Sequence, residues 1–376
     1  EIASCLVGSE MCIRDRAWSG RAIPESGRCF DMRRLFAPTT GSLNGLCTSS
    51  GWASTLPAHP PGERKKAMTV EYLRNTGPVR QGAHRPAAAP DSFIEGTFRN
   101  SAGARYYKLY VPPNPAGKRL PLVVMLHGCS QDADDFAAGT AMNDQGRRHD
   151  FYVLYPVQSR EAHPQRCWNW FENGEQLQGR AEAALLAGMT REVVLAHGID
   201  SQRVYIAGLS AGGAMAALVA RSYPKVYAAA GVHSGLAPGV ASDLSSATAA
   251  MQGLHSKPPT LAGSGIPVIV FHGDQDTTVH PKNALQIISS SLGDTAPEVV
   301  TGMPGERGQH PVTRHIYLNG LGDVIAERWE IHGAGHAWAG GSELGSCTDR
   351  KGPDATCEMV RFFLTFSQNA SAGTGR

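Results

Sequence analysis

The sequence lacks long hydrophobic runs and any strong excess of charge of one sign. Its longest apolar stretch, around residues 120–126, is much shorter than the roughly 20 residues that a membrane-spanning helix requires. Lysine and arginine total 35 and aspartate and glutamate total 33, which leaves a net charge of +2. We therefore expect no membrane span and no nucleic-acid partner.

Motifs of metal and nucleotide chemistry are also missing. The eight cysteines include no C-x-x-C pair, and the chain contains neither a phosphate loop of the G-x-x-x-x-G-K-[ST] type nor a dinucleotide fingerprint. The sequence therefore predicts a protein without a metal site and without an organic cofactor.

Residues 1–90 differ in composition from the rest of the chain. They are rich in Gly, Pro, Ser, Ala and Arg without sustained periodicity, which predicts a disordered tail ahead of a catalytic domain at residues 91–370. The first 16 residues, EIASCLVGSEMCIRDR, resemble translated sequencing-adapter read-through. Neither Glu1 nor Met32 opens the basic and apolar run of a secretory leader, so the sequence itself does not indicate export.

From residue 93 onward, short apolar strands alternate with amphipathic helical patterns. This alternation predicts an α/β fold with a mostly parallel central sheet and helices on both faces, opened by an antiparallel pair of strands. We expect strands at residues 93–99, 106–111, 120–126, 151–155, 203–207, 227–232, 267–271, 314–318 and 326–331, and helices at residues 180–197, 211–223, 281–292 and 354–366.

The most informative short motif is G-x-S-x-G at residues 208–212, with Ser210 at its centre. It follows the predicted strand VYIA directly and opens the predicted helix AGGAMAALVA, which is the strand–turn–helix setting of a nucleophile elbow. The flanking glycines would let the backbone turn sharply and project the serine hydroxyl. Ser210 is therefore the candidate nucleophile, and the alternative is a serine in an ordinary core turn.

A catalytic serine needs a general base, and the base needs an orienting carboxylate. The predicted strand PVIVF ends in HGDQD, which offers Asp274 and Asp276, and the strand RWEIH precedes a glycine-flanked loop that carries His336. This matches the chain order Ser, Asp, His of the fold class. Spacing alone leaves both acids open. His127 and His272 precede glycines at strand ends, and we interpret them as hydrogen-bonded scaffold groups.

An oxyanion hole on this fold combines two backbone N–H groups. The candidates are the amide of Ala211, after the nucleophile, and that of Cys129, in the loop after the third strand. The alternative for Cys129 is a packed thiol in a plain turn. Four cysteines in the body permit two disulfides, which we predict as Cys129–Cys167 and Cys347–Cys357, against four free thiols in a cytoplasmic protein.

Together these motifs resemble the esterases of the polyhydroxybutyrate depolymerase family, close to the feruloyl esterases. The resemblance covers roughly residues 93–366 and rests on LHGCSQDADDFAAGTAMN, RCWNWF, LLAGMTREVV, HGIDSQRVYIAGLSAGGAMAA, HGDQDTTV and GAGHAWAGG. It implies an α/β-hydrolase fold with Ser210 as nucleophile, Asp276 as acid and His336 as base. Asp276 is preferred because the family's acid lies three residues after the Gly of the HG pair.

The resemblance also implies a substrate class: carboxylic esters, in particular 3-hydroxyalkanoate polyesters or their short oligomers. Trp168, Trp338 and His127 are the candidate substrate-binding residues, whereas core packing is the favoured interpretation of Trp170. Because the chain ends ten residues after residue 366, without a surface-binding domain, we expect amorphous or oligomeric esters rather than crystalline polymer. An extracellular or periplasmic monomer is implied.

Two alternatives stay open. A feruloyl or acetyl-xylan esterase would share the triad and differ only in its acyl and alcohol pockets. A hydrolase-like binding protein without catalysis would keep its function after Ser210→Ala, whereas an esterase would lose several orders of magnitude in rate.

Overall fold

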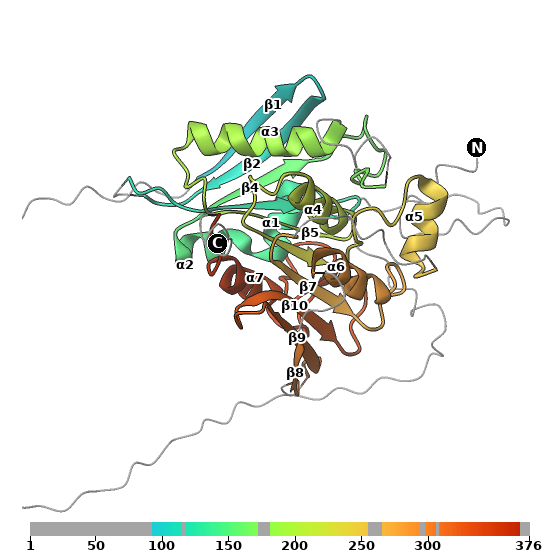
Figure 1. The fold of residues 1–376 in the computed structure, drawn as a ribbon. Coiled ribbons are helices and arrows are strands. Elements are labelled where there is room, and N and C mark those ends of the chain that lie inside the picture. The colour runs from blue at the N-terminus through green and yellow to red at the C-terminus, as the bar shows by residue number, and fades with distance from the viewer. Residues whose placement is uncertain are drawn as a thin grey trace, which may run out of the picture. The chain divides into compact units, whose positions relative to one another are not determined.

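A computed structural model describes residues 92–114, 117–171, 181–254, 265–292, 298–305 and 308–368. The predicted tail at residues 1–90 lies outside the described residues, so its predicted disorder stays a prediction. All the described residues belong to one unit, which is built around a ten-stranded sheet (Figure 1). The sheet order is β1-β2-β4-β3-β5-β6-β7-β10-β9-β8. Its strands are β1 Ser92–Asn100, β2 Gly103–Val111, β3 Leu122–Leu126, β4 Tyr152–Val157, β5 Val204–Leu209, β6 Ala229–His233, β7 Val268–Gly273, β8 Glu298–Met303, β9 Val312–Leu318 and β10 Val324–Ile331.

The centre of the sheet is parallel and its two margins are antiparallel. β4, β3, β5, β6, β7 and β10 run parallel to one another, while β1 and β2 on one side and β9 and β8 on the other pair antiparallel. The prediction of a mostly parallel sheet with an opening antiparallel pair is therefore confirmed. A separate small pair, β11 Trp338–Ala339 and β12 Thr348–Asp349, lies after the main sheet in the chain.

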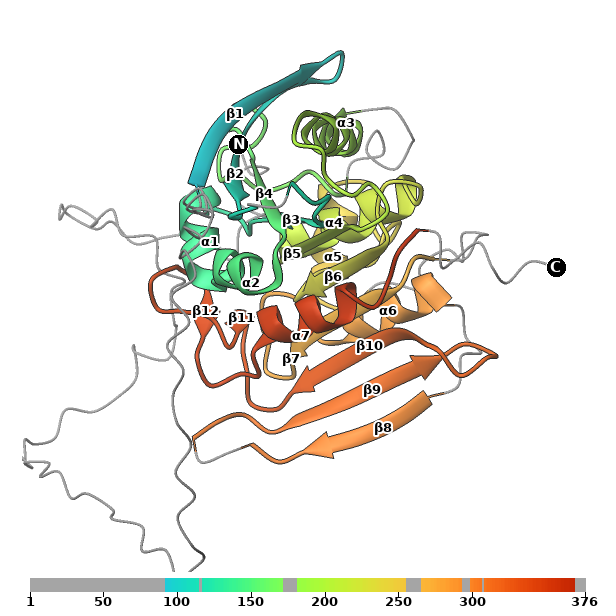
Figure 2. The same ribbon diagram turned by 90° about the vertical axis from the view of Figure 1, so that its left-hand side faces the viewer.

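Helices cover both faces of the sheet (Figure 2). Side chains alternate along β3: Leu122 and Val124 pack toward α3, α4 and α6, whereas Val123 and Met125 pack toward α1, α2 and α7. This alternation with period two is why the central strands are apolar throughout. The helices are α1 Ala133–Thr140, α2 Met142–His149, α3 Ala181–Ala196, α4 Ala211–Ser222, α5 Leu244–Met251, α6 Lys282–Leu292 and α7 Ala355–Phe363.

The sequence analysis missed α1, α2, α5 and the edge strand β8. α1 and α2 are separated by Ala141, whose φ of 53° breaks what would otherwise be one helix into two short ones. Helices of eight residues show too few turns for an apolar period to stand out.

The parallel strands end at one edge of the sheet, and their loops meet there. From β3 the chain passes to β4 on one side, whereas from β5, on the other side of β3, it passes outward to β6. The loops after β3 and β5 therefore lead in opposite directions across the sheet. Such a switch point leaves a crevice at the carboxyl ends of the strands. The loops after β7 and β10 reach the same edge.

Candidate active site

Ser210 forms a sharp turn between β5 and α4. Its φ of 57° and ψ of −121° lie in a region that L-residues rarely adopt. The turn is held by hydrogen bonds at both sides, because the Ser210 N–H donates to the His233 carbonyl at 2.9 Å and its carbonyl accepts from the Ala214 N–H at 2.9 Å. Backbone strain that the surrounding structure holds in place is typical of functional turns.

The two glycines of the motif serve a different purpose from the one expected. Neither Gly208 nor Gly212 has a positive φ, and Ser210 carries that conformation itself. A Cβ on Gly212 would lie 2.1 Å from the Leu126 carbonyl oxygen, and one on Gly208 would lie 2.4 Å from the Gly212 carbonyl carbon. The glycines are therefore needed because α4 packs directly against the backbone of β3.

Asp276 and His336 meet side chain to side chain. The His336 ring donates from Nδ1 to Asp276 Oδ2 at 2.7 Å. Asp276 Oδ1 accepts the N–H groups of Thr278 at 2.9 Å and Val279 at 2.8 Å, so the buried carboxylate is fixed within its own loop. Asp274 points elsewhere: it accepts from His332 at 3.1 Å and from the Gly333 N–H at 2.7 Å.

The surroundings of Asp276 favour its ionised form. Burial works to raise the pKa of this carboxyl, but the charge of His336 and hydrogen bonds from His272 and His336 outweigh it and hold the pKa below its usual range. His272 Nε2 lies 3.3 Å from Asp276 Oδ2 and donates to the Val279 carbonyl at 2.7 Å. Burial lowers the pKa of the nearby His233 to about 3, so that ring is neutral.

Ser210 and His336 line the same pocket, together with the residues that carry both predicted oxyanion donors. The space between the lining atoms, including the part that is open to solvent, is about 600 Å³. Among the described residues, His336 is the one lining residue with an ionisable side chain. The lining residues are Gly128, Cys129, Gln131, Trp170, Leu209, Ser210, Ala211, Leu236, Met251, Thr278, Val279, His336 and Cys347.

One of the two predicted disulfides is present. Cys129 is bonded to Cys167, which ties the loop after β3 to the loop after β4. The predicted Cys347–Cys357 pair is wrong, because Cys357 carries a free, exposed thiol while Cys347 is disulfide-bonded. Spacing across a Gly-Pro turn could not show that Cys357 lies on α7 and faces solvent.

The three residues predicted to bind substrate are buried in the core, and for His127 this agrees with its other interpretation as a scaffold group. Trp168 and Trp338 are 0% and 1% exposed, and their indole N–H groups donate to the His127 carbonyl and to Thr356 Oγ1. His127 is fully buried, donates from Nδ1 to the Gly128 carbonyl and accepts the Gln158 N–H. Those three are scaffold groups that do not line the pocket. Trp170, expected in the core, is 6% exposed and lines it.

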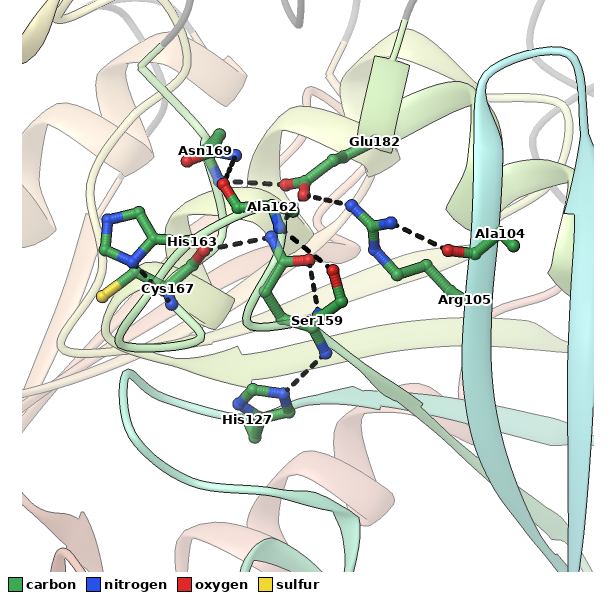
Figure 3. A network of polar contacts seen from close by, with 10 residues as sticks. Ala104, Arg105, His127, Ser159, Ala162, His163, Cys167, Asn169 and Glu182 are labelled. Atoms are coloured by element: carbon green, nitrogen blue, oxygen red, sulfur yellow. Dashed lines mark hydrogen bonds and ion pairs between the residues drawn. The ribbon is translucent and has the colours of Figure 1, made fainter.

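A polar network joins Glu182 to Arg105 and to the loop after β4 (Figure 3). Glu182 on α3 accepts from Arg105 on β2 at 2.7 Å and from the Asn169 N–H at 3.0 Å. It also accepts from the Gln158 side chain, which donates to the Cys167 carbonyl at 3.0 Å. The carboxylate thereby binds the loop at residues 158 and 169, on either side of Cys167.

The sequence analysis missed Glu182, Gln158 and the pocket residue Gln131. Glu182 lies between two alanines, which does not by itself distinguish a buried partner from a surface group, and Gln131 and Gln158 adjoin polar residues, so the local sequence gave no sign of their burial.

The described residues offer no group of three or more His, Cys, Asp or Glu side chains that could hold a metal ion. Within the same residues, no helix has the length and hydrophobicity needed to cross a bilayer.

Comparisons with known proteins give a consistent result. A family model described as Esterase PHB depolymerase matches residues 105–302. Poly(3-hydroxyalkanoate) depolymerase C of Paucimonas lemoignei is 32% identical over 243 residues, which cover 60% of this chain and 56% of that protein. Feruloyl esterase B of Thermothelomyces thermophilus is 31% identical over 218 residues, which cover 52% and 73% of the two chains.

A solved structure, the acetyl xylan esterase from Aspergillus awamori, superposes with a TM-score of 0.52 at 22% identity over 62% of this chain and 89% of that one. Together with the sheet order, this likeness confirms the predicted α/β-hydrolase fold. The sequence match between this chain and the Paucimonas depolymerase spans little more than half of the length of that depolymerase.

Proposed function

The chain belongs to the esterase PHB depolymerase family, and on that premise we propose that it is a serine carboxylic-ester hydrolase acting on short-chain 3-hydroxyalkanoate polyesters or oligomers. The observation that carries this proposal is the hydrogen bond between His336 and Asp276 at the wall of the pocket that also contains Ser210. A base that is oriented by a buried carboxylate beside a strained serine is the arrangement that acyl transfer requires.

The proposed reaction proceeds through an acyl-enzyme. His336 Nε2 takes the proton of the Ser210 hydroxyl as Oγ attacks the ester carbonyl carbon, and the N–H groups of Cys129 and Ala211 stabilise the tetrahedral oxyanion. When the intermediate collapses, the C–O bond to the alcohol breaks and the alcohol leaves with the proton from His336. Water then attacks the acyl-enzyme by the same route and releases the acid and the free serine.

The pocket wall supports an uncharged ester as substrate. Trp170, Leu236, Met251 and Val279 provide apolar surface, and none of the described residues that line the pocket is a lysine, arginine, aspartate or glutamate. A charged acyl group would lose hydration there without gaining a partner. An internal segment of a 3-hydroxyalkanoate chain presents only methylene, methine, alkyl and ester groups, and it places no charge in such a site.

A feruloyl or acetyl-xylan ester is the second candidate substrate. It is favoured by the feruloyl esterase B relative, of which the match covers 73%, a larger share than of the depolymerase. Trp170 offers a flat ring on which a feruloyl ring could stack.

The experiment compares wild type, Ser210→Ala and Asp276→Asn on p-nitrophenyl esters from acetate to decanoate, amorphous poly(3-hydroxybutyrate), methyl ferulate and acetylated xylan. We expect wild type to hydrolyse short esters and clear the polymer, and both variants to lose about 10³-fold or more in kcat. Two matched controls, Ser290→Ala on α6 and Asp274→Asn, keep activity within about tenfold because they leave the triad intact.

Each outcome has a distinct meaning. Ferulate or acetate release without polymer clearing would move the substrate to plant cell-wall esters and keep the mechanism. Equal activity of wild type and Ser210→Ala, or no ester hydrolysis by wild type, would overturn the proposal of a serine esterase.

A further inference from the structure

We propose that Gln131 is a positioning residue that orients the Cys129 peptide for its role in the oxyanion hole. Its side-chain amide does so as part of a hydrogen-bonded cluster with Asp135 and Ser346, which we call the clamp. This inference rests on the proposed function. Gln131 is 3% exposed and lines the pocket beside Gly128 and Cys129. It is three residues beyond Gly128, too far along the chain to belong to the donor peptide itself.

The Gln131 side chain has one orientation that satisfies its contacts. Its Oε1 accepts the Gly128 N–H at 2.9 Å, and its Nε2 donates to Asp135 Oδ2 at 2.9 Å, to Ser346 Oγ at 3.1 Å and to the Ser346 carbonyl at 3.2 Å. A flipped amide would face an N–H with an NH₂ group and a carboxylate with an oxygen. The direction of the Gly128 N–H is thus set by groups on α1 and on the loop before β12.

The outer end of the clamp is itself held in place. Asp135 Oδ1 accepts the Ser346 N–H at 2.7 Å, and its other oxygen accepts the Ser346 hydroxyl. Gly345 lies against α1 so closely that a Cβ there would come within 2.3 Å of the Asp135 carbonyl oxygen. Because Asp135 is in the first turn of α1, the clamp joins a helix terminus to a loop more than two hundred residues away in the chain.

The Cys129 amide lies between two peptides whose N–H groups are committed. The Gly128 N–H is bound by Gln131, and the Ser130 N–H donates to the Gln165 carbonyl at 2.6 Å. The Cys129 side chain is tied to Cys167. The peptide that presents the Cys129 N–H is itself held through its carbonyl, that of Gly128, which accepts from His127 Nδ1 at 2.7 Å and from the Gln131 N–H at 3.3 Å. Gln131 thus holds this peptide through its backbone and the preceding peptide through its side chain, in a segment that lines the same pocket as Ser210.

An oxyanion donor stabilises a transition state only when its direction is set before the reaction. Gln131 does not have to touch the reacting atoms, since it acts through the Gly128–Cys129 backbone. The expected signature is therefore a loss in kcat and in affinity for a tetrahedral analogue, with little change in binding of the planar ester.

The first test compares Gln131→Met with Gln145→Met. Gln145 is 7% exposed on α2 and is not in the pocket, so the control makes the same chemical change at similar burial. We expect Gln131→Met to lower kcat about 10- to 100-fold with KM within about twofold, and to weaken inhibition by phenylboronic acid by the same factor as kcat/KM. Gln145→Met should change none of these kinetic values, even where it lowers Tm.

The second test uses Gln131→Glu over a range of pH. An ionised carboxyl there would repel Asp135 and leave the clamp open, whereas a protonated one can accept from Gly128 and donate to Asp135. The ratio of mutant to wild-type kcat should therefore rise as pH falls. His127 and Arg166 face this region as well, and the ratio to wild type removes their common effect.

The outcomes separate the two proposals. Ester hydrolysis by wild type that disappears in Ser210→Ala, together with wild-type kcat and boronate affinity in Gln131→Met, would overturn the positioning role alone. The proposal would also be overturned if Gln131→Met and Gln145→Met showed the same decrease in kcat and the same change in KM. If Gln131→Met does not fold, Asp135→Asn replaces it with the same criteria, and a flat pH ratio for Gln131→Glu counts against the proposal.

Discussion

The positive φ at Ser210 and the missing Cβ at Gly212 are separate requirements of one turn. Ser210 adopts the strained conformation, and Gly212 lets α4 approach the β3 carbonyls that precede the predicted oxyanion loop. The G-x-S-x-G string shows both positions but not which of them bears the strain.

We predict that Gly212→Ala lowers both stability and activity. Its new Cβ would meet the backbone oxygens of Leu126 at 2.1 Å and His127 at 2.5 Å, which cannot move aside as a side chain can. Overpacking of this kind lowers the free energy of unfolding by about 1–3 kcal/mol, and urea unfolding of the variant measures this loss. Gly302→Ala is the control, since nothing lies within 4 Å of its Cβ position and its free energy of unfolding should stay close to that of wild type. Equal stability of the two variants would contradict the packing argument.

His127 makes stability depend on pH. Burial lowers the pKa of this ring to about 4 from an ordinary value of 6.5, so the unfolded chain binds its proton first. Its contribution is complete above pH 6.5 and is lost as pH falls toward 4, by about 3 kcal/mol. The free energies of unfolding of wild type and His127→Gln, measured with urea at a series of pH values, should converge as pH falls over this range. Parallel curves would show that His127 does not carry this dependence.

At the scale of elements, the contact between β2, α3 and the loop after β4 includes one buried ion pair. The Arg105 and Glu182 side chains are 12% and 6% exposed, and Glu182 also accepts backbone and side-chain donors from the loop (Figure 3). The amphipathic pattern of α3 predicted the helix correctly. It could not predict that a glutamate near its first turn faces inward, because helical period and polarity place such a residue in solvent by default.

We predict that Glu182→Leu destabilises the protein by about 3–5 kcal/mol, because Arg105 would remain buried without its carboxylate. The double variant Arg105→Met with Glu182→Leu should recover part of this loss. Urea unfolding measures both. The exposed pair of Arg350 and Glu343 supplies the control, and Glu343→Gln should cost less than about 1 kcal/mol. A double variant less stable than Glu182→Leu would argue against an uncompensated charge as the cause.

At the scale of the molecule, the pocket is assembled from segments far apart in the chain. The loops after β3, β5, β7 and β10 contribute Cys129, Ser210, Val279 and His336, and α5 adds Met251. The Cys129–Cys167 bond ties the loop after β3 to the loop after β4, which carries the pocket residue Trp170, and the two cysteines are 38 residues apart in the sequence.

We predict that replacing both Cys129 and Cys167 by serine lowers the free energy of unfolding by about 4 kcal/mol, the loop-closure value for this separation. The same variant should lose kcat, because the peptide of a predicted oxyanion donor is no longer tied to the neighbouring loop. Cys357→Ser removes a free, exposed thiol and should change neither quantity. Wild-type kcat in the double variant, measured where it is fully folded, would contradict the role of this link.

Local patterns were sufficient to predict the alternating elements, the mostly parallel sheet and the turn at Ser210 between a strand and a helix. They left Asp274 and Asp276 both open as the acid, and only the resemblance to a known family favoured Asp276. Apolar periods of two and 3.6 residues, and glycines beside a serine, record how each segment is buried. Side-chain direction at the strand ends was beyond their reach. Three features depend on loop backbone angles and on partners distant in the chain. They are the burial of the Trp168 and Trp338 side chains, the contact of His336 with Asp276 rather than Asp274, and the clamp from Gln131 to Ser346. Those contacts exist only once the loops meet at one edge of the sheet.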